Sequence, residues 1–137
     1  MYHLMLLVRR ATSLQIGRLG RFSFPHGCYV YTGSAMNGLE RRIARHSRKR
    51  KTLHWHVDYL LRRAELIEAL LIPTRRRIEC ERNLRVLALP GARIVAPGFG
   101  SGGCRCPSHL AYLGPLPESG CRLLLKLLQP SAGAREV

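Results

Sequence analysis

A strand pattern that leads through a glycine turn into a helix pattern, between Gly27 and His46, most constrains how this chain can fold. Tyr29 and Tyr31 recur with the two-residue period of a β-strand, which predicts a strand over residues 28–32. A loop that contains glycine and serine follows, and residues 39–48 then have the spacing of a helix. The end of a tyrosine strand must therefore lie next to the start of a charged helix.

The predicted helix carries a stripe that mixes apolar and polar side chains. Residues at helix positions i, i+3, i+4 and i+7 share one face, which here holds Leu39, Arg42, Ile43 and His46. A face that packs only against a core would be uniformly apolar, so the arginine and the histidine indicate a functional site. Three further arginines occupy the opposite face, where they can meet solvent or a polyanion: Arg41, Arg45 and Arg48.

The order of patterns along the rest of the chain predicts a small α+β domain. The expected strands cover residues 3–9 and 28–32 and a buried strand over 66–72, with a hairpin-like segment over 14–24. The expected helices cover residues 39–48, 53–63 and 78–89, whereas residues 121–128 fit a strand or a short helix. We therefore expect one domain over residues 1–129, with a central antiparallel or mixed sheet flanked by helices, and a disordered tail over 130–137.

The charge of the chain is strongly unbalanced. Lys and Arg total 23 against 8 Asp and Glu, which gives a net charge of +15. Such an excess favours a nucleic acid as partner, because basic side chains release the counterions of a phosphate backbone. A solvated basic face is the alternative explanation. The predicted nucleic-acid contacts are Gly33, Ser34, Arg41, Arg45, Arg48, Lys49, Arg50 and Lys51.

The sequence does not have the patterns of a membrane or secreted protein. No apolar run approaches the roughly 20 residues that cross a bilayer, and no helix pattern presents large apolar side chains opposite the basic run. The first residues lack the basic leader and the small-residue cleavage site of a signal peptide. We therefore expect a cytoplasmic protein without a membrane partner.

A loop with two cysteines and a histidine is a candidate metal site. Cys104, Cys106 and His109 could supply three zinc ligands, with Cys80 or another residue as the fourth. The spacing lacks the paired C-x2-C units of common zinc motifs, so a loop without metal is the alternative. The odd total of 5 cysteines, without a secretion signal, argues against a disulfide framework.

Five sequence blocks, in order along the chain, resemble a known nuclease family. They are GCYVYTGSA, RIARH, HWHVDYL, IECE and GFGSGGCRCPSHL. YTG followed by a helix with an arginine is similar to the second half of the GIY-YIG motif. Together the blocks resemble an uncharacterised GIY-YIG-like family whose members are sometimes fused to endonuclease III. The resemblance covers residues 2–113 and implies a GIY-YIG-like fold, phosphodiester hydrolysis and a functional link to endonuclease III-type DNA repair.

The resemblance implies roles for particular residues. The tyrosine and glycine of YIG fall on Tyr31 and Gly33, and the catalytic arginine falls on Arg42. The nearest candidate for the tyrosine of the first half-motif is Tyr2.

The same resemblance implies a bound divalent metal ion. The acidic ligand for Mg2+ or Mn2+ falls on Glu79 or Glu81, and Glu79 is favoured because it opens the family's Glu-Cys block. One departure concerns the loop before the paired cysteines, where the family usually has Ser-Asp and this chain has Gly102-Gly103. If that aspartate held a metal ion or oriented a histidine, this chain has lost the function or moved it elsewhere.

These residue types suit hydrolysis of a phosphodiester. A tyrosine near a divalent metal can take a proton from the attacking water, a role that fits Tyr31 with Tyr29 or Tyr2 beside it. Arg42 offers a planar, permanently charged fork to the scissile phosphate. His46, one helical turn later, could hydrogen-bond the phosphate or protonate the leaving group. The structural alternatives are a core tyrosine, an arginine at the edge of the stripe and a helix-terminal cation.

The segment HWHVDYL contributes to a possible second site. His54 and Asp58 are i,i+4 neighbours in a helix, so the carboxylate could orient the imidazole, while His56 lies on a different face. A buried polar pair that fixes helix packing is the alternative. The possible second site comprises His54, His56, Asp58, Cys104, Cys106 and His109.

Three functional hypotheses follow from the sequence. The first is a metal-dependent endonuclease of the GIY-YIG type that acts on DNA in repair or processing. The second is a nucleic-acid-binding module on the same fold with weak or absent catalysis. The third is a zinc-stabilised interaction protein with the segment CRCPSH at its centre.

Overall fold

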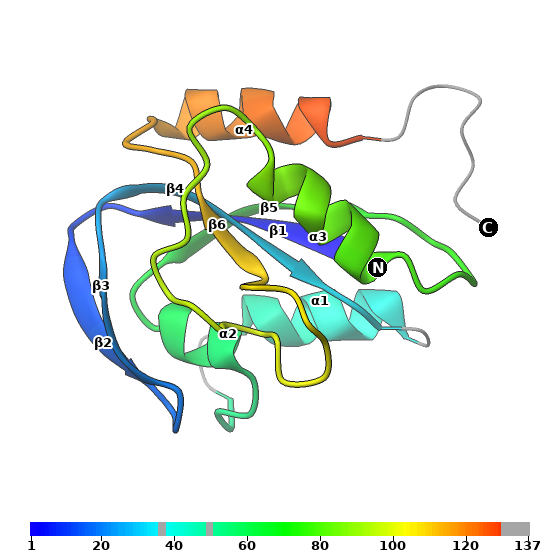
Figure 1. Ribbon diagram of the computed structural model, residues 1–137, viewed down its shortest axis with the longest axis horizontal. Helices are drawn as coiled ribbons and strands as arrows, with labels where there is room; N and C mark the ends of the chain where they lie inside the picture. The colour runs from blue at the N-terminus through cyan, green and yellow to red at the C-terminus, as the bar shows by residue number, and fades with distance from the viewer. Residues whose placement is uncertain (36–37, 49–50, 130–137) are drawn as a thin grey trace.

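The chain folds around a four-stranded antiparallel sheet (Figure 1). The computed structural model describes residues 1–35, 38–48 and 51–129. The strand order is β5-β1-β4-β6, with β1 over Tyr2–Val8, β4 over Gly27–Gly33, β5 over Glu65–Leu71 and β6 over Leu110–Tyr112. A separate hairpin pairs β2 (Thr12–Ile16) with β3 (Gly20–Phe24). The helices are α1 (Leu39–Ser47), α2 (His56–Leu60), α3 (Glu79–Leu87) and α4 (Glu118–Leu127).

Helices cover both faces of the sheet, so its central strands are buried on both sides. In Figure 1, α1 and α2 lie below the sheet and α4 lies above it, while α3 is drawn across β1. Val86 of α3 packs in the same core as Leu125 of α4. Alternate residues of β1 enter two separate cores: Leu4 and Leu6 pack on the side of α1 and α2, while Met5 and Leu7 pack on the side of α3 and α4. This double coverage explains the uninterrupted apolar run of β1. The prediction of an α+β fold with an antiparallel sheet is confirmed.

The structure corrects one helix prediction and decides one that the sequence left open. α2 covers only His56–Leu60 instead of residues 53–63, because the chain enters it in an extended conformation, with φ −100° and ψ 159° at Trp55. Residues 121–128, which fit a strand or a short helix, belong to α4. This helix begins directly after Pro117, a position at which the missing N–H of a proline costs no helical hydrogen bond.

The strand predictions also change at the two edges of the sheet. The strand predicted over residues 66–72 is not a buried strand, because β5 pairs only with β1 and its residues are half-buried or exposed. β6 has no counterpart in the sequence prediction, since its 3 residues are too few to show a period. The loop before β6 nevertheless carries the predicted cysteine and histidine ligands.

Some predictions concern residues that the structure does not describe. The tail expected over residues 130–137 lies outside the described residues, as do Lys49 and Arg50 of the basic run. Within the described part of the chain, no helix combines the length and the apolar character needed to cross a membrane.

The pairing of β1 with β4 places Tyr2 directly opposite Gly33. The Tyr2 ring crosses over this glycine, and a Cβ atom added to Gly33 would lie only 2.5 Å from the Tyr2 hydroxyl oxygen. Because interiors are close-packed, a side chain at position 33 would force the ring to move. The glycine of YTG is thus required for the packing of the tyrosine on the neighbouring strand.

We expect Gly33→Ala to destabilise the fold by about 1–3 kcal/mol, the usual cost of overpacking a filled core. The added methyl group must push the Tyr2 ring from its buried position, and urea denaturation measures the loss of unfolding free energy. Gly102→Ala is the matched control, because Gly102 is exposed and an added Cβ atom meets nothing within 4 Å. Its unfolding free energy should stay within about 0.5 kcal/mol of wild type. Equal stability of the two variants would contradict this account of Gly33.

Candidate functional site

Two tyrosines and a histidine meet at the end of the sheet where β1 begins and β4 ends. The Tyr2 hydroxyl lies 2.8 Å from Nε2 of His46, a contact that joins β1 to α1. The rings of Tyr2 and Tyr31 are 6.4 Å apart between centroids. All three side chains are buried. Tyr31 of β4 and His46 of α1 thus both lie against Tyr2 of β1. We call these three residues the tyrosine group.

Tyr29 does not belong to the tyrosine group. Its hydroxyl donates to the backbone carbonyl of Pro25, and its ring packs against Tyr112 at 4.8 Å between centroids. Of the two tyrosines that the sequence places beside Tyr31, the structure therefore selects Tyr2.

Arg42 is held at the edge of the tyrosine group. One of its terminal nitrogens donates to the backbone carbonyl of Ser34 at 3.0 Å. Its guanidinium carbon lies 4.3 Å from the centroid of the Trp55 ring, within the range of a cation–π contact. Ser34, a predicted nucleic-acid contact, thus uses its carbonyl oxygen to orient Arg42.

Burial sets the protonation of the tyrosine group. It raises the pKa of Tyr2 to about 12, although the adjacent Arg42 guanidinium acts to lower it, and it raises the pKa of Tyr31 above its ordinary range. Burial also lowers the pKa of His46 to about 4. At neutral pH Tyr2 therefore keeps its proton and His46 is uncharged, so the tyrosine hydroxyl can donate to Nε2.

The second ring nitrogen of His46 faces a buried carboxylate. Nδ1 lies 3.9 Å from Oδ1 of Asp58, and within the described residues this nitrogen has no hydrogen-bond partner. A proton on Nδ1 is attracted by the carboxylate, whereas a lone pair there would be repelled. Asp58 thus favours the tautomer in which Nε2 accepts the hydrogen bond from Tyr2.

Asp58 is fully buried and accepts four hydrogen bonds. Arg45 donates to both of its oxygens, at 2.9 and 3.0 Å, and the backbone N–H groups of His54 and Trp55 donate to Oδ2. The predicted contact between the His54 imidazole and Asp58 is wrong, because the backbone of His54 reaches the carboxylate instead. Burial alone would raise the pKa of Asp58, but Arg45 and the N–H groups outweigh it and lower this pKa.

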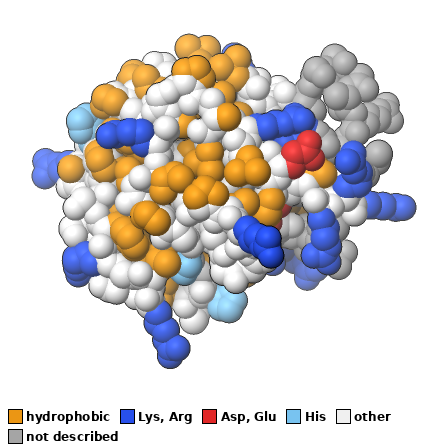
Figure 2. Space-filling view, in the orientation of Figure 1, with side chains coloured by type: hydrophobic (Ala, Val, Ile, Leu, Met, Phe, Trp, Pro, Cys, Tyr) orange, Lys and Arg blue, Asp and Glu red, His pale blue; other side chains and the backbone are white. Residues whose placement is uncertain are grey.

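The basic run divides into exposed and structural members. Arg41 and Arg48 are exposed, as the helix spacing predicts. Arg45 does not face solvent as predicted, because it forms the ion pair with Asp58. Lys51 donates to carbonyl oxygens at the end of α1, where a cation suits the helix terminus. Figure 2 shows basic side chains around the rim of one face of the molecule, where acidic side chains are few.

Of the two predicted acidic metal ligands, Glu79 lies near the tyrosine group and Glu81 points away. Burial is the largest cause that raises the pKa of Tyr2 and of Tyr31, and the negative charge of Glu79 acts in the same direction. Glu81 is exposed and pairs with Arg85 at 3.2 Å. Residues two positions apart on a helix are rotated by about 200°, so only one of the two glutamates can face the sheet.

Three cysteines and a histidine form a cluster beside Glu79. The Sγ atoms of Cys80, Cys104 and Cys106 and a ring nitrogen of His109 all lie within 4.8 Å of one another. The three ligands predicted from the loop therefore meet, and Cys80 from α3 is the fourth. This group, which we call the Cys3His cluster, could bind a metal ion such as zinc.

The remaining members of the possible second site do not join the Cys3His cluster. His56 accepts a hydrogen bond from the backbone N–H of Gly100 at 2.8 Å, and its ring packs edge-on against Phe99. His54 is exposed. His56 thus supports the loop that crosses Tyr31, where a Cβ atom added to Gly100 would lie 3.1 Å from the Tyr31 ring.

A comparison with protein families extends over almost the whole chain. The family model described as domain of unknown function DUF123 matches residues 1–127. The chain belongs to the DUF123 family. Searches of the curated proteins and of the solved structures found no match. The tyrosine group and the Cys3His cluster both lie within the DUF123 domain.

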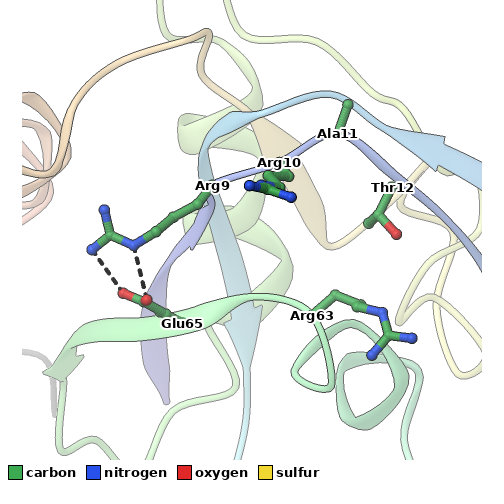
Figure 3. Close-up of a pocket in the computed structure, with 6 residues that line it drawn as sticks. All are labelled: Arg9, Arg10, Ala11, Thr12, Arg63 and Glu65. Atoms are coloured by element: carbon green, nitrogen blue, oxygen red, sulfur yellow. Dashed lines mark hydrogen bonds and ion pairs between the residues drawn. The ribbon is translucent and has the colours of Figure 1, made fainter.

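The DUF123 domain also has an arginine-lined cavity that the sequence analysis did not single out. Its volume is about 460 Å3, and it is lined by Arg9, Arg10, Ala11, Thr12, Arg63 and Glu65 (Figure 3). Arg9 donates two hydrogen bonds to the Glu65 carboxylate, which offsets part of the positive charge. The cavity follows the C-terminal end of β1, whereas Tyr2 begins that strand, so it is separate from the tyrosine group.

We expect the DUF123 domain to lose stability as the pH falls from about 6.5 to about 4. Burial lowers the pKa of His46 from 6.5 to about 4, so in this range the unfolded chain binds a proton that the folded chain does not. Stability then rises with pH and is lost on acidification. Between pH 7 and pH 5, His46→Gln should lose about 1–2 kcal/mol less stability than wild type in urea unfolding. His3, whose pKa burial also lowers to about 4, is present in both proteins. An identical pH dependence would contradict a neutral, buried His46.

Proposed function

We propose that this DUF123 domain is a metal-dependent endonuclease of the GIY-YIG type that hydrolyses phosphodiester bonds in DNA. The observation that carries the proposal is the hydrogen bond between Tyr2 and His46, formed beside Arg42 and Glu79 at one end of the sheet. The resemblance to GIY-YIG nucleases assigns roles to Tyr2, Arg42 and Glu79, whereas His46 is predicted from its place on the helix stripe. A proton acceptor, a fixed positive charge and a carboxylate in one place suit the attack of water on a phosphate.

Arg42 stabilises the negative charge that builds on the scissile phosphate. The Ser34 carbonyl and the Trp55 ring hold its guanidinium before a substrate arrives, so little reorganisation is needed during the reaction. An arginine stays charged at any relevant pH and presents paired N–H groups to phosphate oxygens.

Tyr2, His46 and Asp58 form a path for the proton of the attacking water. Burial raises the pKa of Tyr2 to about 12, so Tyr2 does not act as a free phenolate at neutral pH. It accepts a proton from water while its own proton passes to Nε2 of His46, 2.8 Å away. The imidazolium formed in this way lies 3.9 Å from the Asp58 carboxylate, which stabilises the new charge. His46 therefore acts through Tyr2 in this proposal.

A divalent cation fits the carboxylate of the site. Glu79 holds Mg2+ or Mn2+ in this proposal, since these hard cations prefer oxygen ligands and Mg2+ usually keeps several waters. When bound, such an ion neutralises charge on the phosphate and lowers the pKa of a bound water. One Glu79 oxygen lies 3.0 Å from His109, which leaves the second oxygen for this role.

The charge of the domain supports a nucleic acid as the substrate. The net charge of +15 and the exposed Arg41 and Arg48 near the tyrosine group favour a phosphate backbone. Contacts of this kind position a backbone and do not read base sequence. The resemblance to a family with members fused to endonuclease III favours a role in DNA repair or processing.

Arg42→Ala should slow the cleavage of labelled duplex or branched DNA in Mg2+ or Mn2+ by about 10²–10³-fold, because transition-state charge is no longer stabilised. Arg41→Ala is the matched control, since it removes the same charge from an exposed position one residue earlier on α1. This control should weaken DNA binding slightly and keep the single-turnover cleavage rate near that of wild type. Circular dichroism checks that both variants are folded.

The same experiment separates the nuclease from its main alternative. If wild type and Arg42→Ala bind DNA equally and neither cleaves it in either metal, the nuclease proposal is wrong. That result would support a nucleic-acid-binding module on the same fold.

Glu79→Gln should lower the cleavage rate by about 10²-fold or more and raise the Mg2+ concentration needed for half-maximal activity, because the charged oxygen ligand is lost. Glu81→Gln is the matched control on the same helix, where Glu81 is exposed and paired with Arg85. Cleavage rates measured over a range of Mg2+ concentrations compare the two variants. Equal effects of the two substitutions would contradict the assignment of Glu79.

A further inference from the structure

The Cys3His cluster lies where the loop before β6 meets the first turn of α3. Cys80 is the second residue of α3, whereas the other three members belong to the loop. The two parts are also joined by the buried side-chain amide of Asn83, which donates to the carbonyl of Ser108 at 2.7 Å. Backbone hydrogen bonds across the base of the loop close it on itself. The four ligand atoms are therefore held on ordered backbone.

The spacing of the four ligand atoms fits one metal ion. A tetrahedral zinc ion with Zn–S bonds of about 2.3 Å separates its sulfur ligands by about 3.8 Å. The candidate atoms all lie within 4.8 Å of one another, and Sγ of Cys104 is 3.1 Å from Nε2 of His109. A cluster of several irons needs cysteine sulfurs further apart, because iron and sulfide atoms stand between them. Three thiolates and one imidazole complete a tetrahedron, as in structural zinc sites.

The orientation of His109 points independently to a metal ligand. Its Nδ1 lies 3.0 Å from the Glu79 carboxylate and 3.0 Å from the carbonyl oxygen of Thr32. Both partners are acceptors, so Nδ1 carries a proton and the lone pair of Nε2 can face the cysteines. A carboxylate and a backbone carbonyl are both usual partners for the far nitrogen of a zinc-bound histidine. The His109 side chain is fully buried, so solvent does not compete for either nitrogen.

We propose that Cys80, Cys104, Cys106 and His109 bind a single structural Zn2+, with Glu79 as the partner that fixes His109. The ion fastens the loop before β6 to α3. It thereby positions Glu79 and also Gly100, where an added Cβ atom would lie 3.1 Å from the Tyr31 ring. This zinc site is distinct from the Mg2+ or Mn2+ of the proposed nuclease and does not depend on that activity.

Metal analysis of the full chain, purified without added metal, tests the proposal. We expect near-stoichiometric zinc in wild type and its loss in Cys104→Ser and Cys106→Ser. Cys121→Ala is the matched control, because it removes a buried thiol that lies outside the cluster, and it should keep the zinc. Absence of bound zinc, iron and sulfide in its place, or an unchanged zinc content in Cys104→Ser would each overturn the proposal.

A measurement on wild type covers the case in which the serine variants do not fold. Co2+ exchanged into the protein should give the visible absorption of tetrahedral thiolate coordination, and a spectrum without thiolate bands would overturn the site.

The role of Glu79 has its own comparison. Glu79→Ala should bind zinc about 10–100-fold more weakly in competition with a chelator, the usual effect of removing a carboxylate partner. Glu81→Ala should bind zinc like wild type, and equal affinities in the two variants would overturn the role of Glu79. None of these measurements uses DNA cleavage, so failure of the zinc site and failure of the nuclease are distinguishable.

Discussion

The antiparallel pairing of β1 with β4 is the constraint on which the rest of the structure depends. Both strands are buried on both faces, so a slip by one residue would turn every core side chain of a strand to the wrong side. The register that results sets Tyr2 opposite Gly33 and His3 opposite Thr32, where a hydrogen bond of 2.9 Å joins the two side chains. The position of Tyr2 thus follows from the packing of two cores and is not set by local structure at the chain terminus.

The buried carboxylate of Asp58 is the second constraint. It is one of only 8 acidic residues in a chain with 23 Lys and Arg. Asp58 is surrounded by Arg45, two backbone N–H groups and, at a longer distance, His46. Removing one partner of a buried ion pair costs several kcal/mol, since the other charge stays buried without compensation. Asp58 therefore both joins α1 to α2 and gives His46 a defined tautomer, which links the stability of this region to the geometry of the tyrosine group.

The parts of the candidate site that lie in one local segment could be predicted from the sequence. Tyr31, Arg42 and His46 follow one another along a strand, a loop and a helix, whose periods fix where the side chains point. Tyr2 could be given only as the nearest candidate, because its place depends on the register of β1 against β4. The choice of Glu79 depends on the rotation of α3 about its axis, which the spacing of two glutamates does not define.

The incorrect predictions have the same physical origin. Helix spacing alone placed Arg45 on a solvent face, but a carboxylate from another helix turned it inward. The i,i+4 spacing of His54 and Asp58 assumed a helix that starts earlier than α2, whereas the chain there is extended and offers its backbone N–H groups. Period and spacing describe one element at a time, and each of these contacts joins two parts of the chain.

Glu79 is the point at which the two candidate sites meet. The positions Gly102 and Gly103 are exposed, and a Cβ atom added to either meets nothing within 4 Å, so a side chain there would begin in open space. The carboxylate that holds His109 comes from α3 instead, at 3.0 Å. The same carboxylate is near enough to influence both Tyr2 and Tyr31. A displacement of α3 against the loop before β6 must therefore disturb the histidine of the Cys3His cluster and the charge beside the tyrosine group together. If Glu79 has both proposed roles, the first turn of α3 needs a rigid attachment, because one side chain then serves the histidine of the Cys3His cluster and the tyrosine group at once.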